Sequence, residues 1–125
     1  MSVLARLAAR GGLAVLVDPA RTRAAEGAEL ARGAAAEGAA ALLIGNSFGE
    51  GEDAGALARA MKAAAPEVPL LQFPATASQL VADVDAVLFL CLISGRNAQY
   101  LIEEQVRAVP FFARHPTLEV IATAY

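Results

Sequence analysis

Five short, mainly apolar runs recur along this 125-residue chain and restrict it to few architectures. Each run is continuous rather than alternating, which is typical of a strand buried on both faces of a parallel sheet. The runs cover residues 13–17, 41–44, 68–72, 86–93 and 118–122. Because parallel strands need long crossover connections, this pattern predicts helices between them.

Stretches rich in alanine and glutamate lie between the apolar runs, and both residue types favour helix. Thr76 and Gln79 have the spacing of a capping box, and Asn97 is a favourable N-cap. The helices predicted in this way cover residues 22–36, 53–65, a short segment 76–82, and 97–113. Strand and helix therefore alternate, which predicts parallel strands joined by right-handed crossovers.

This order of elements fits either an open doubly wound sheet or a (β/α) barrel. A closed eight-stranded barrel takes about 250 residues, so 125 residues amount to about its first five strands. We therefore expect an α/β fold made of the parallel (β/α) units of a TIM barrel. It would be a single domain over residues 1–125, the N-terminal part of an incomplete barrel. Open edges at its first and last strands favour a homo-oligomer.

Composition argues against several classes of protein. The formal net charge is −3 and the ten Lys and Arg residues are scattered, so we expect no nucleic-acid partner. One Cys and one His cannot build a disulfide or a Cys/His metal cluster, which fits a cytoplasmic location. The longest apolar run, residues 86–93, is far shorter than the ~20 residues of a membrane span. The apolar stretch near the N-terminus is too short for a signal peptide, so we expect the chain to start as the mature protein.

Ligands of parallel α/β folds bind at the carboxyl ends of the strands, so the segments after the strands form the candidate site. Asp18 is the acidic residue at such a tip, and with the hydroxyl of Ser47 it could hold Mg²⁺. So few protein ligands suit a cation that also binds substrate phosphates. The alternative is that Asp18 caps the first predicted helix, with Pro19 at an early helical position.

Two further strand ends have competing interpretations. The turn at residues 45–49 could offer backbone N–H groups to an anion, but it lacks the Walker and dinucleotide-binding patterns and fits a plain turn better. Arg96 could bind a phosphate, or it could pair with Asp83 or Asp85.

The single thiol and the single imidazole are poor catalytic candidates. Cys91 lies in the most apolar run, so it is expected to pack rather than to act as a nucleophile. His115 precedes the last strand, at the end opposite the candidate site. We therefore expect neither residue to be catalytic.

The strand-end segments form an ordered series of motifs. They are Asp18-Pro-Ala-Arg21, Gly45-Asn-Ser47, Phe73-Pro-Ala75, Asp85-Ala-Val-Leu-Phe-Leu-Cys-Leu-Ile-Ser-Gly-Arg-Asn-Ala98 and Glu119-Val-Ile-Ala-Thr-Ala-Tyr125. This series resembles that of the geranylgeranylglyceryl phosphate and heptaprenylglyceryl phosphate synthases. Those enzymes carry Asp-Pro-Asp-Lys, Gly-Gly-Ser, Phe-Pro-Gly, Asp-Ala-x-Leu-Phe-Leu-Ser-Leu-Leu-Asn-Ser-Arg-Asn-Pro and Glu-Val-Ile-Pro-Thr-Gly-Tyr. The resemblance covers nearly the whole chain, and the fourth segment is its most specific part.

The resemblance implies a TIM barrel that joins sn-glycerol 1-phosphate to a polyprenyl diphosphate through an ether bond, with Mg²⁺, in phospholipid biosynthesis. Asp18 and Ser47 match the family's metal-binding positions, and Arg21, Arg96 and Tyr125 are the expected substrate-binding residues. The cation would neutralise the leaving diphosphate while the glycerol hydroxyl attacks the allylic carbon. The prenyl tail would need an apolar channel, which small Ala-lined helices could provide.

The chain also departs from the family pattern. Arg21 replaces a Lys, and alanines replace an acid, two glycines and a proline of the motifs, at Ala20, Ala75, Ala124 and Ala122. Ala in place of Gly restricts the backbone where φ must be positive, so reshaped loops are expected. In the family the glycerol-phosphate cradle lies in loops after later strands than these five. We therefore expect the chain by itself to bind glycerol phosphate weakly or not at all, and so to be inactive or incomplete as an enzyme on its own.

Two other functions remain open at this point. The first is a catalytically inactive half-barrel that acts as a structural or interaction protein by pairing its open edges. The second is an open α/β sheet that binds a mononucleotide, for which the sequence carries no phosphate-binding fingerprint.

Overall fold

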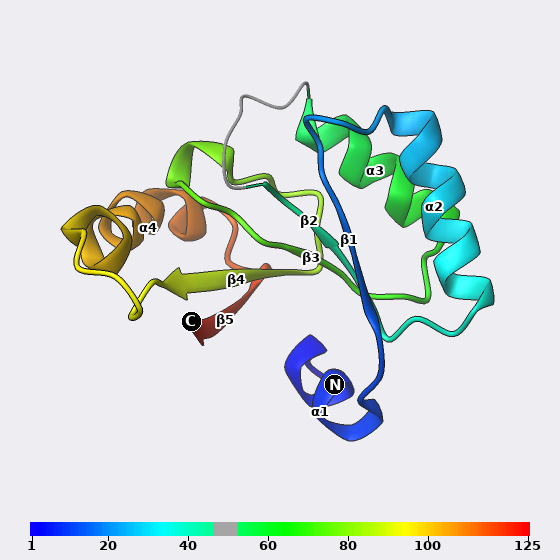
Figure 1. Ribbon diagram of the computed structural model, residues 1–125, viewed down its shortest axis with the longest axis horizontal. Coiled ribbons are helices and arrows are strands. Elements are labelled where there is room, and N and C mark those ends of the chain that lie inside the picture. The colour runs from blue at the N-terminus through cyan, green and yellow to red at the C-terminus, as the bar shows by residue number, and fades with distance from the viewer. Residues whose placement is uncertain (47–52) are drawn as a thin grey trace.

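A computed structural model describes residues 1–46 and 53–125 and places five strands in one parallel sheet (Figure 1). The strands are β1 (Ala14–Val17), β2 (Ala41–Ile44), β3 (Leu70–Gln72), β4 (Ala86–Cys91) and β5 (Glu119–Ala124). Their spatial order, β1-β2-β3-β4-β5, is also their order along the chain. A doubly wound sheet changes direction at a switch point, whereas a barrel does not. The sheet is therefore a segment of a (β/α) barrel, and the predicted fold class is confirmed.

The crossover helices pack against one face of this sheet. They are α2 (Ala24–Ala36), α3 (Ala54–Ala64), the short 3-10 turn η1 (Ala77–Gln79) and α4 (Glu104–Arg114), which continues from the π-helical turn η2 (Gln99–Glu103). The core between sheet and helices includes the fully buried Leu42, Ile44, Leu57, Met61, Leu70 and Val87. Burial of these apolar side chains supplies the main force that holds the helices on the sheet.

The structure adds a helix that the sequence analysis does not predict, α1 (Val3–Arg10). Its N-cap is Ser2, whose Oγ accepts a main-chain N–H at 3.1 Å. The carboxylate of Glu119 accepts the N–H groups of Val3 at 2.6 Å and Leu4 at 3.0 Å. A carboxylate there satisfies unpaired donors and complements the helix dipole. The helix therefore lies against the face of the sheet opposite α2 and α3, near the start of β5 (Figure 1).

The two predicted helix caps have different outcomes. Thr76 makes no capping hydrogen bond, and the helix predicted over 76–82 is only the turn η1. The Oε1 of Gln79 instead accepts the N–H of Ala75, at 2.8 Å. The N-cap residue of η2 is Ala98 rather than the predicted Asn97, although the Oδ1 of Asn97 accepts the N–H of Gln99 at 3.0 Å.

Burial on both faces, predicted for every strand, holds for β3 but is wrong for β1 and β5. Leu16 in β1 is 57% exposed and Val120 in β5 is 42% exposed. Within residues 1–46 and 53–125, these two strands each pair with one neighbour only. The face of the sheet away from the crossover helices is covered mainly by α1, so side chains such as Leu16 stay accessible there. Among the helices that the structure describes, none is long and apolar enough to cross a bilayer.

Candidate functional site

Asp18 follows β1 and lies beside Asn46, which follows β2. Its Oδ1 accepts the N–H of Ala20 at 2.8 Å and the Nδ2–H of Asn46 at 3.2 Å. The alternative that Asp18 caps the next helix is wrong, because α2 begins at Ala24 and its N-cap is Arg23. Asp18 therefore presents a half-buried carboxylate at the carboxyl end of the sheet, and its Oδ2 receives no hydrogen bond from the residues described.

The residue before Asn46 fixes where that side chain lies. The N–H of Gly45 donates to the carbonyl oxygen of Val17 at 3.2 Å. On its other side, a Cβ built at Gly45 would lie only 1.9 Å from the carbonyl oxygen of Phe73. Only glycine permits this approach between the ends of β2 and β3. Asn46 is thus held close to the segment that follows β3.

Two glutamines extend the contact between Asp18 and Asn46. The Nε2 of Gln79 donates to the Oδ1 of Asn46 at 3.3 Å. The Nε2 of Gln72, a residue only 3% exposed, donates to the main-chain oxygen of Gln79 at 2.6 Å, and its Oε1 accepts the N–H of Val81 at 3.0 Å. A buried amide satisfied at both ends holds its surroundings in one arrangement. We call the series Asp18, Asn46, Gln79 and Gln72 the polar chain, which crosses the ends of β1, β2 and β3.

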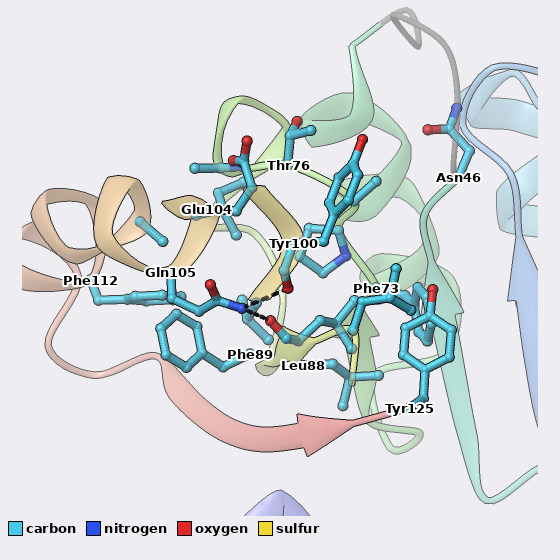
Figure 2. A pocket seen from close by; sticks show the side chains of 18 residues that line it. Asn46, Phe73, Thr76, Leu88, Phe89, Tyr100, Glu104, Gln105, Phe112 and Tyr125 are labelled. Atoms are coloured by element: carbon cyan, nitrogen blue, oxygen red, sulfur yellow. Dashed lines mark hydrogen bonds between the residues drawn. The ribbon is translucent and has the colours of Figure 1, made fainter. Parts of the chain in front are cut away.

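An apolar cavity of about 330 Å³ adjoins the polar chain, and Asn46 belongs to both (Figure 2). The cavity lies between the segment after β3, strand β4, the turn η2 and helix α4. Its larger apolar and aromatic lining residues are Phe73, Leu80, Leu88, Phe89, Leu90, Leu92, Tyr100, Phe112 and Tyr125. The cavity is therefore walled mainly by leucine and aromatic side chains, whereas the channel that we expected would be lined by small alanines.

Aromatic pairs fix two walls of the cavity. The rings of Phe73 and Tyr125 meet edge to face with centroids 5.7 Å apart, and those of Phe89 and Phe112 do so at 5.5 Å. This is the preferred geometry for aromatic pairs, because the positive edge of one ring faces the negative face of the other. The first pair joins the end of β5 to the segment after β3. These walls are therefore preformed for an apolar ligand.

Gln105 contributes the least satisfied polar atom of the cavity wall. Its Nε2 donates to the main-chain oxygens of Leu90 and, at 3.3 Å, of Tyr100 (Figure 2). Its Oε1 is buried and has no hydrogen-bond partner within the described part of the chain. The wall thus carries one spare acceptor among apolar groups.

Glu104 lies in the same wall and ties α4 to η1. Its Oε2 accepts the N–H of Ala77 at 2.7 Å, and its Oε1 accepts from Gln99 at 3.0 Å and from Arg107 at 2.9 Å. Burial alone would raise the pKa of this carboxyl, but these three hydrogen bonds outweigh burial and hold the pKa below its ordinary value of 4.5. The charged form of Glu104 therefore stabilises the folded state.

This balance predicts an acid-sensitive contribution to stability. A carboxyl whose pKa is lower when folded stabilises the fold above pH 4.5, and the stabilisation is lost as the pH falls through the folded-state pKa. Glu104→Gln removes the charge, so we expect it to lower the free energy of unfolding by about 1–3 kcal/mol at pH 7. The difference from the parent chain should shrink towards pH 3, as measured by urea unfolding at each pH. A difference that stays constant with pH would contradict this role.

Four of the five predicted site residues, Asp18, Arg21, Arg96 and Tyr125, lie in segments that follow strands, as expected. Asp18 and Tyr125 are at the ends of β1 and β5, and Tyr125 lines the cavity. Arg21 is exposed, and its N–H donates to the main-chain oxygen of Asp18 at 3.1 Å. Ser47, the second predicted metal ligand, lies outside the described residues.

Arg96 is exposed in the segment after β4. The alternative that it pairs with Asp83 or Asp85 is wrong, because other cations hold both carboxylates. Arg59 pairs with Asp83 at 3.0 Å and Lys62 with Asp85 at 2.5 Å. Within residues 1–46 and 53–125, no carboxylate forms an ion pair with Arg96, which leaves its guanidinium accessible to an anion.

The single thiol and the single imidazole lie as the sequence predicts. The Sγ of Cys91 donates to the main-chain oxygen of Leu101 at 3.3 Å, in a packing role. His115 follows the last residue of α4, so it precedes β5 and lies at the end of the sheet away from Asp18. Its ring contacts that of Phe111 with centroids 4.6 Å apart.

No role in the site was predicted from the sequence for five residues: Asn46, Gln72, Gln79, Glu104 and Gln105. Two of these residues could have been noticed in the sequence. Gln72 ends an otherwise apolar run, and Gln79 stands at a capping-box position. An amide that closes a buried strand must be hydrogen-bonded, which points to a partner nearby. Glu104 and Gln105 lie in an ordinary helical stretch, where spacing does not distinguish them from solvent-facing residues.

Comparison with known proteins gives consistent matches. A family model described as the PcrB family matches residues 9–125. The geranylgeranylglyceryl phosphate synthase of Caldivirga maquilingensis is 37% identical over 128 residues, which cover 99% of this chain and 47% of that protein. The synthase of Methanothrix thermoacetophila is 36% identical over 112 residues, 88% of this chain and 43% of that protein. The chain thus spans a little under half the length of these curated relatives.

Solved structures agree on the fold. Wild-type GGGPS from Thermoplasma volcanium superposes on the whole chain with a TM-score of 0.90 at 23% identity, and the match covers 51% of that structure. (S)-3-O-geranylgeranylglyceryl phosphate synthase from Thermoplasma acidophilum, in complex with its substrate sn-glycerol-1-phosphate, gives a TM-score of 0.86 at 25% identity. The match covers 100% of this chain and 52% of that structure. The chain therefore has the fold of about half of such a barrel.

Proposed function

Because the chain belongs to the PcrB family, we propose that it acts as a prenyltransferase of the geranylgeranylglyceryl phosphate synthase type. The reaction joins sn-glycerol 1-phosphate to a polyprenyl diphosphate through an ether bond, as a step of phospholipid biosynthesis. The observation that carries the proposal is the contact between two unlike features: Asn46 hydrogen-bonds the Asp18 carboxylate and also lines the apolar cavity. A polyprenyl diphosphate has the same division into a charged head and an apolar tail.

The donor chemistry at Asp18 suits Mg²⁺. One Oδ is held by two hydrogen bonds, while the other receives none from the described residues. A single carboxylate oxygen is a hard ligand of the kind that Mg²⁺ combines with water and substrate phosphates. In this proposal Asp18 and Ser47 hold the ion. When bound, it would supply positive charge that stabilises the diphosphate leaving group.

The remaining residues position the two ends of the prenyl substrate. The cavity takes the tail, because its walls replace water with apolar contacts at about 25 cal/mol per Å² buried. The aromatic rings of Phe73 and Tyr125 attract positive charge at their faces, which favours the cationic character that the allylic carbon gains. Arg21 and Arg96 offer exposed guanidinium groups to the phosphates. The attacking hydroxyl belongs to sn-glycerol 1-phosphate, the substrate found in the Thermoplasma acidophilum structure.

Three further parts of the proposal concern the setting of the enzyme. We propose a cytoplasmic location, which the lone Cys91 supports because its thiol has no second cysteine to bond. A homo-oligomer is supported by strands β1 and β5, each unpaired on one side among the described residues. The net charge of −3 supports the absence of a nucleic-acid partner.

The decisive experiment, made on the longest available form of the protein, is product formation from radiolabelled sn-glycerol 1-phosphate with a series of polyprenyl diphosphates, with and without Mg²⁺. The expected result is a label extractable into organic solvent only when Mg²⁺ is present, and the preferred chain length would name the substrate. The matched control replaces the glycerol phosphate by its sn-3 enantiomer. No product from that protein, shown by circular dichroism to be folded, would contradict the synthase proposal and favour an inactive half-barrel.

A further inference from the structure

The side-chain amide of Asn46 is held in one orientation. Its Nδ2 donates to Asp18 at 3.2 Å, and its Oδ1 accepts from the Nε2 of Gln79 at 3.3 Å. A flip of the amide would set an oxygen against the Asp18 carboxylate and an N–H against the N–H of Gln79. Both contacts would then be repulsive, so Gln79 determines that Asn46 presents a donor to Asp18.

Gln79 in turn has no freedom to release Asn46. Its Oε1 accepts the N–H of Ala75 at 2.8 Å. Its main-chain oxygen accepts the Nε2–H of Gln72 at 2.6 Å, and Gln72 is only 3% exposed. The anchored end of the polar chain thus lies in the core of the sheet. Its other end reaches the Asp18 carboxylate through Asn46.

Asn46 also borders the cavity, as Figure 2 shows from its place at one edge of the lining. We propose that Asn46 is a positioning residue that fixes the Asp18 carboxylate at this edge of the cavity and so sets the place of a divalent cation and its diphosphate there. The inference rests on the proposed function and deepens it. Asn46 occupies one carboxylate oxygen and leaves the other to the cation. It acts through Asp18 and is not a catalytic residue.

The test measures Mn²⁺ binding to the full 125-residue chain by electron paramagnetic resonance, in the presence of inorganic pyrophosphate. Asn46→Leu keeps the size of the side chain but cannot donate, and it should weaken Mn²⁺ binding about 10-fold, the range found when a partner of a metal ligand is removed. Gln79→Leu should change affinity in the same direction by a smaller factor, because it removes one of the two contacts that hold the amide of Asn46 in its orientation.

Asp18→Ala separates the two proposals. If Asn46→Leu binds Mn²⁺ like the parent chain while Asp18→Ala does not bind it, the positioning role is overturned and the cation site stands. If Asp18→Ala also binds like the parent chain, the cation site itself is wrong. Thermal unfolding of each variant shows whether it is folded, and Gln79→Leu carries the test if Asn46→Leu is not.

Discussion

In any active form of the protein, Asp18→Ala is expected to lower Mg²⁺-dependent prenyl transfer at least about 100-fold, the loss typical when a group that stabilises developing charge is removed. Asp18 is the carboxylate that follows β1, and its Oδ2 is free of hydrogen bonds from the described residues. Without it the proposed site loses the carboxylate that Asp18 offers to the cation. The rate of product formation at saturating polyprenyl diphosphate measures the effect. Unchanged turnover would remove Asp18 from the site.

The matched variant Asp18→Asn tests whether prenyl transfer needs the negative charge of this side chain or only its hydrogen bonds. The side chain of Asn in Asp18→Asn keeps an oxygen that can accept from the N–H of Ala20 and from Asn46. We therefore expect Asp18→Asn to unfold at the same temperature as the parent chain within about 2 °C, since surface changes of this kind alter stability little. Its prenyl transfer should nevertheless fall as far as that of Asp18→Ala. A variant that keeps activity would show that the negative charge is not needed.

The strands could be predicted closely because their apolar runs are continuous and bounded by polar residues. The run at residues 41–44 coincides with β2, and the others differ from the strands only at their ends. Strand order could not be predicted from the crossovers alone, because right-handed crossovers fit either an open sheet or a barrel. The resemblance to the synthase family implied a barrel, and the observed strand order agrees with it.

Helix α1 could not be predicted from the sequence, because it depends on a long-range contact. Its stability depends on Glu119, which lies 116 residues from Val3 and accepts two of its N–H groups. A helix of eight residues is marginal by itself, so tertiary contacts decide whether it forms. The polar chain is similar, since Asp18, Asn46 and Gln79 meet only after three strands align. Long-range contacts of this kind leave no periodic signal in the sequence.

The residues of the family motifs do not all lie at the same end of the sheet. Asp85 belongs to the most specific matching segment, yet its carboxylate accepts the N–H of Leu70 at 2.8 Å and pairs with Lys62. It therefore joins β3, β4 and α3 at the end of the sheet away from Asp18. Glu119 likewise caps α1. A motif shared with an enzyme family thus includes structural acids, and only the strand-end geometry assigns Asp18 to the site.

Gly45→Ala is expected to destabilise the fold by about 3 kcal/mol, at the upper end of the usual cost of overpacking. The new Cβ would lie 1.9 Å from the carbonyl oxygen and 2.8 Å from the carbonyl carbon of Phe73, and both are main-chain atoms that cannot rotate away. Relief would require β2 and β3 to separate, which breaks the hydrogen bond from the N–H of Phe73 to Ile44. The midpoint of urea unfolding measures this loss.

Gly33→Ala is the matched control, because a Cβ at Gly33 meets nothing within 4 Å and this glycine lies inside α2. Alanine is the better helix former by about 1 kcal/mol, so this variant should unfold at a higher urea concentration. Replacing glycine by alanine should thus lower the free energy of unfolding at Gly45 and raise it at Gly33, because only the Cβ at Gly45 would meet main-chain atoms. A Gly45→Ala variant as stable as the parent chain would mean that β2 and β3 do not approach so closely. In that case Asn46 would also lose the placement that brings it to Asp18.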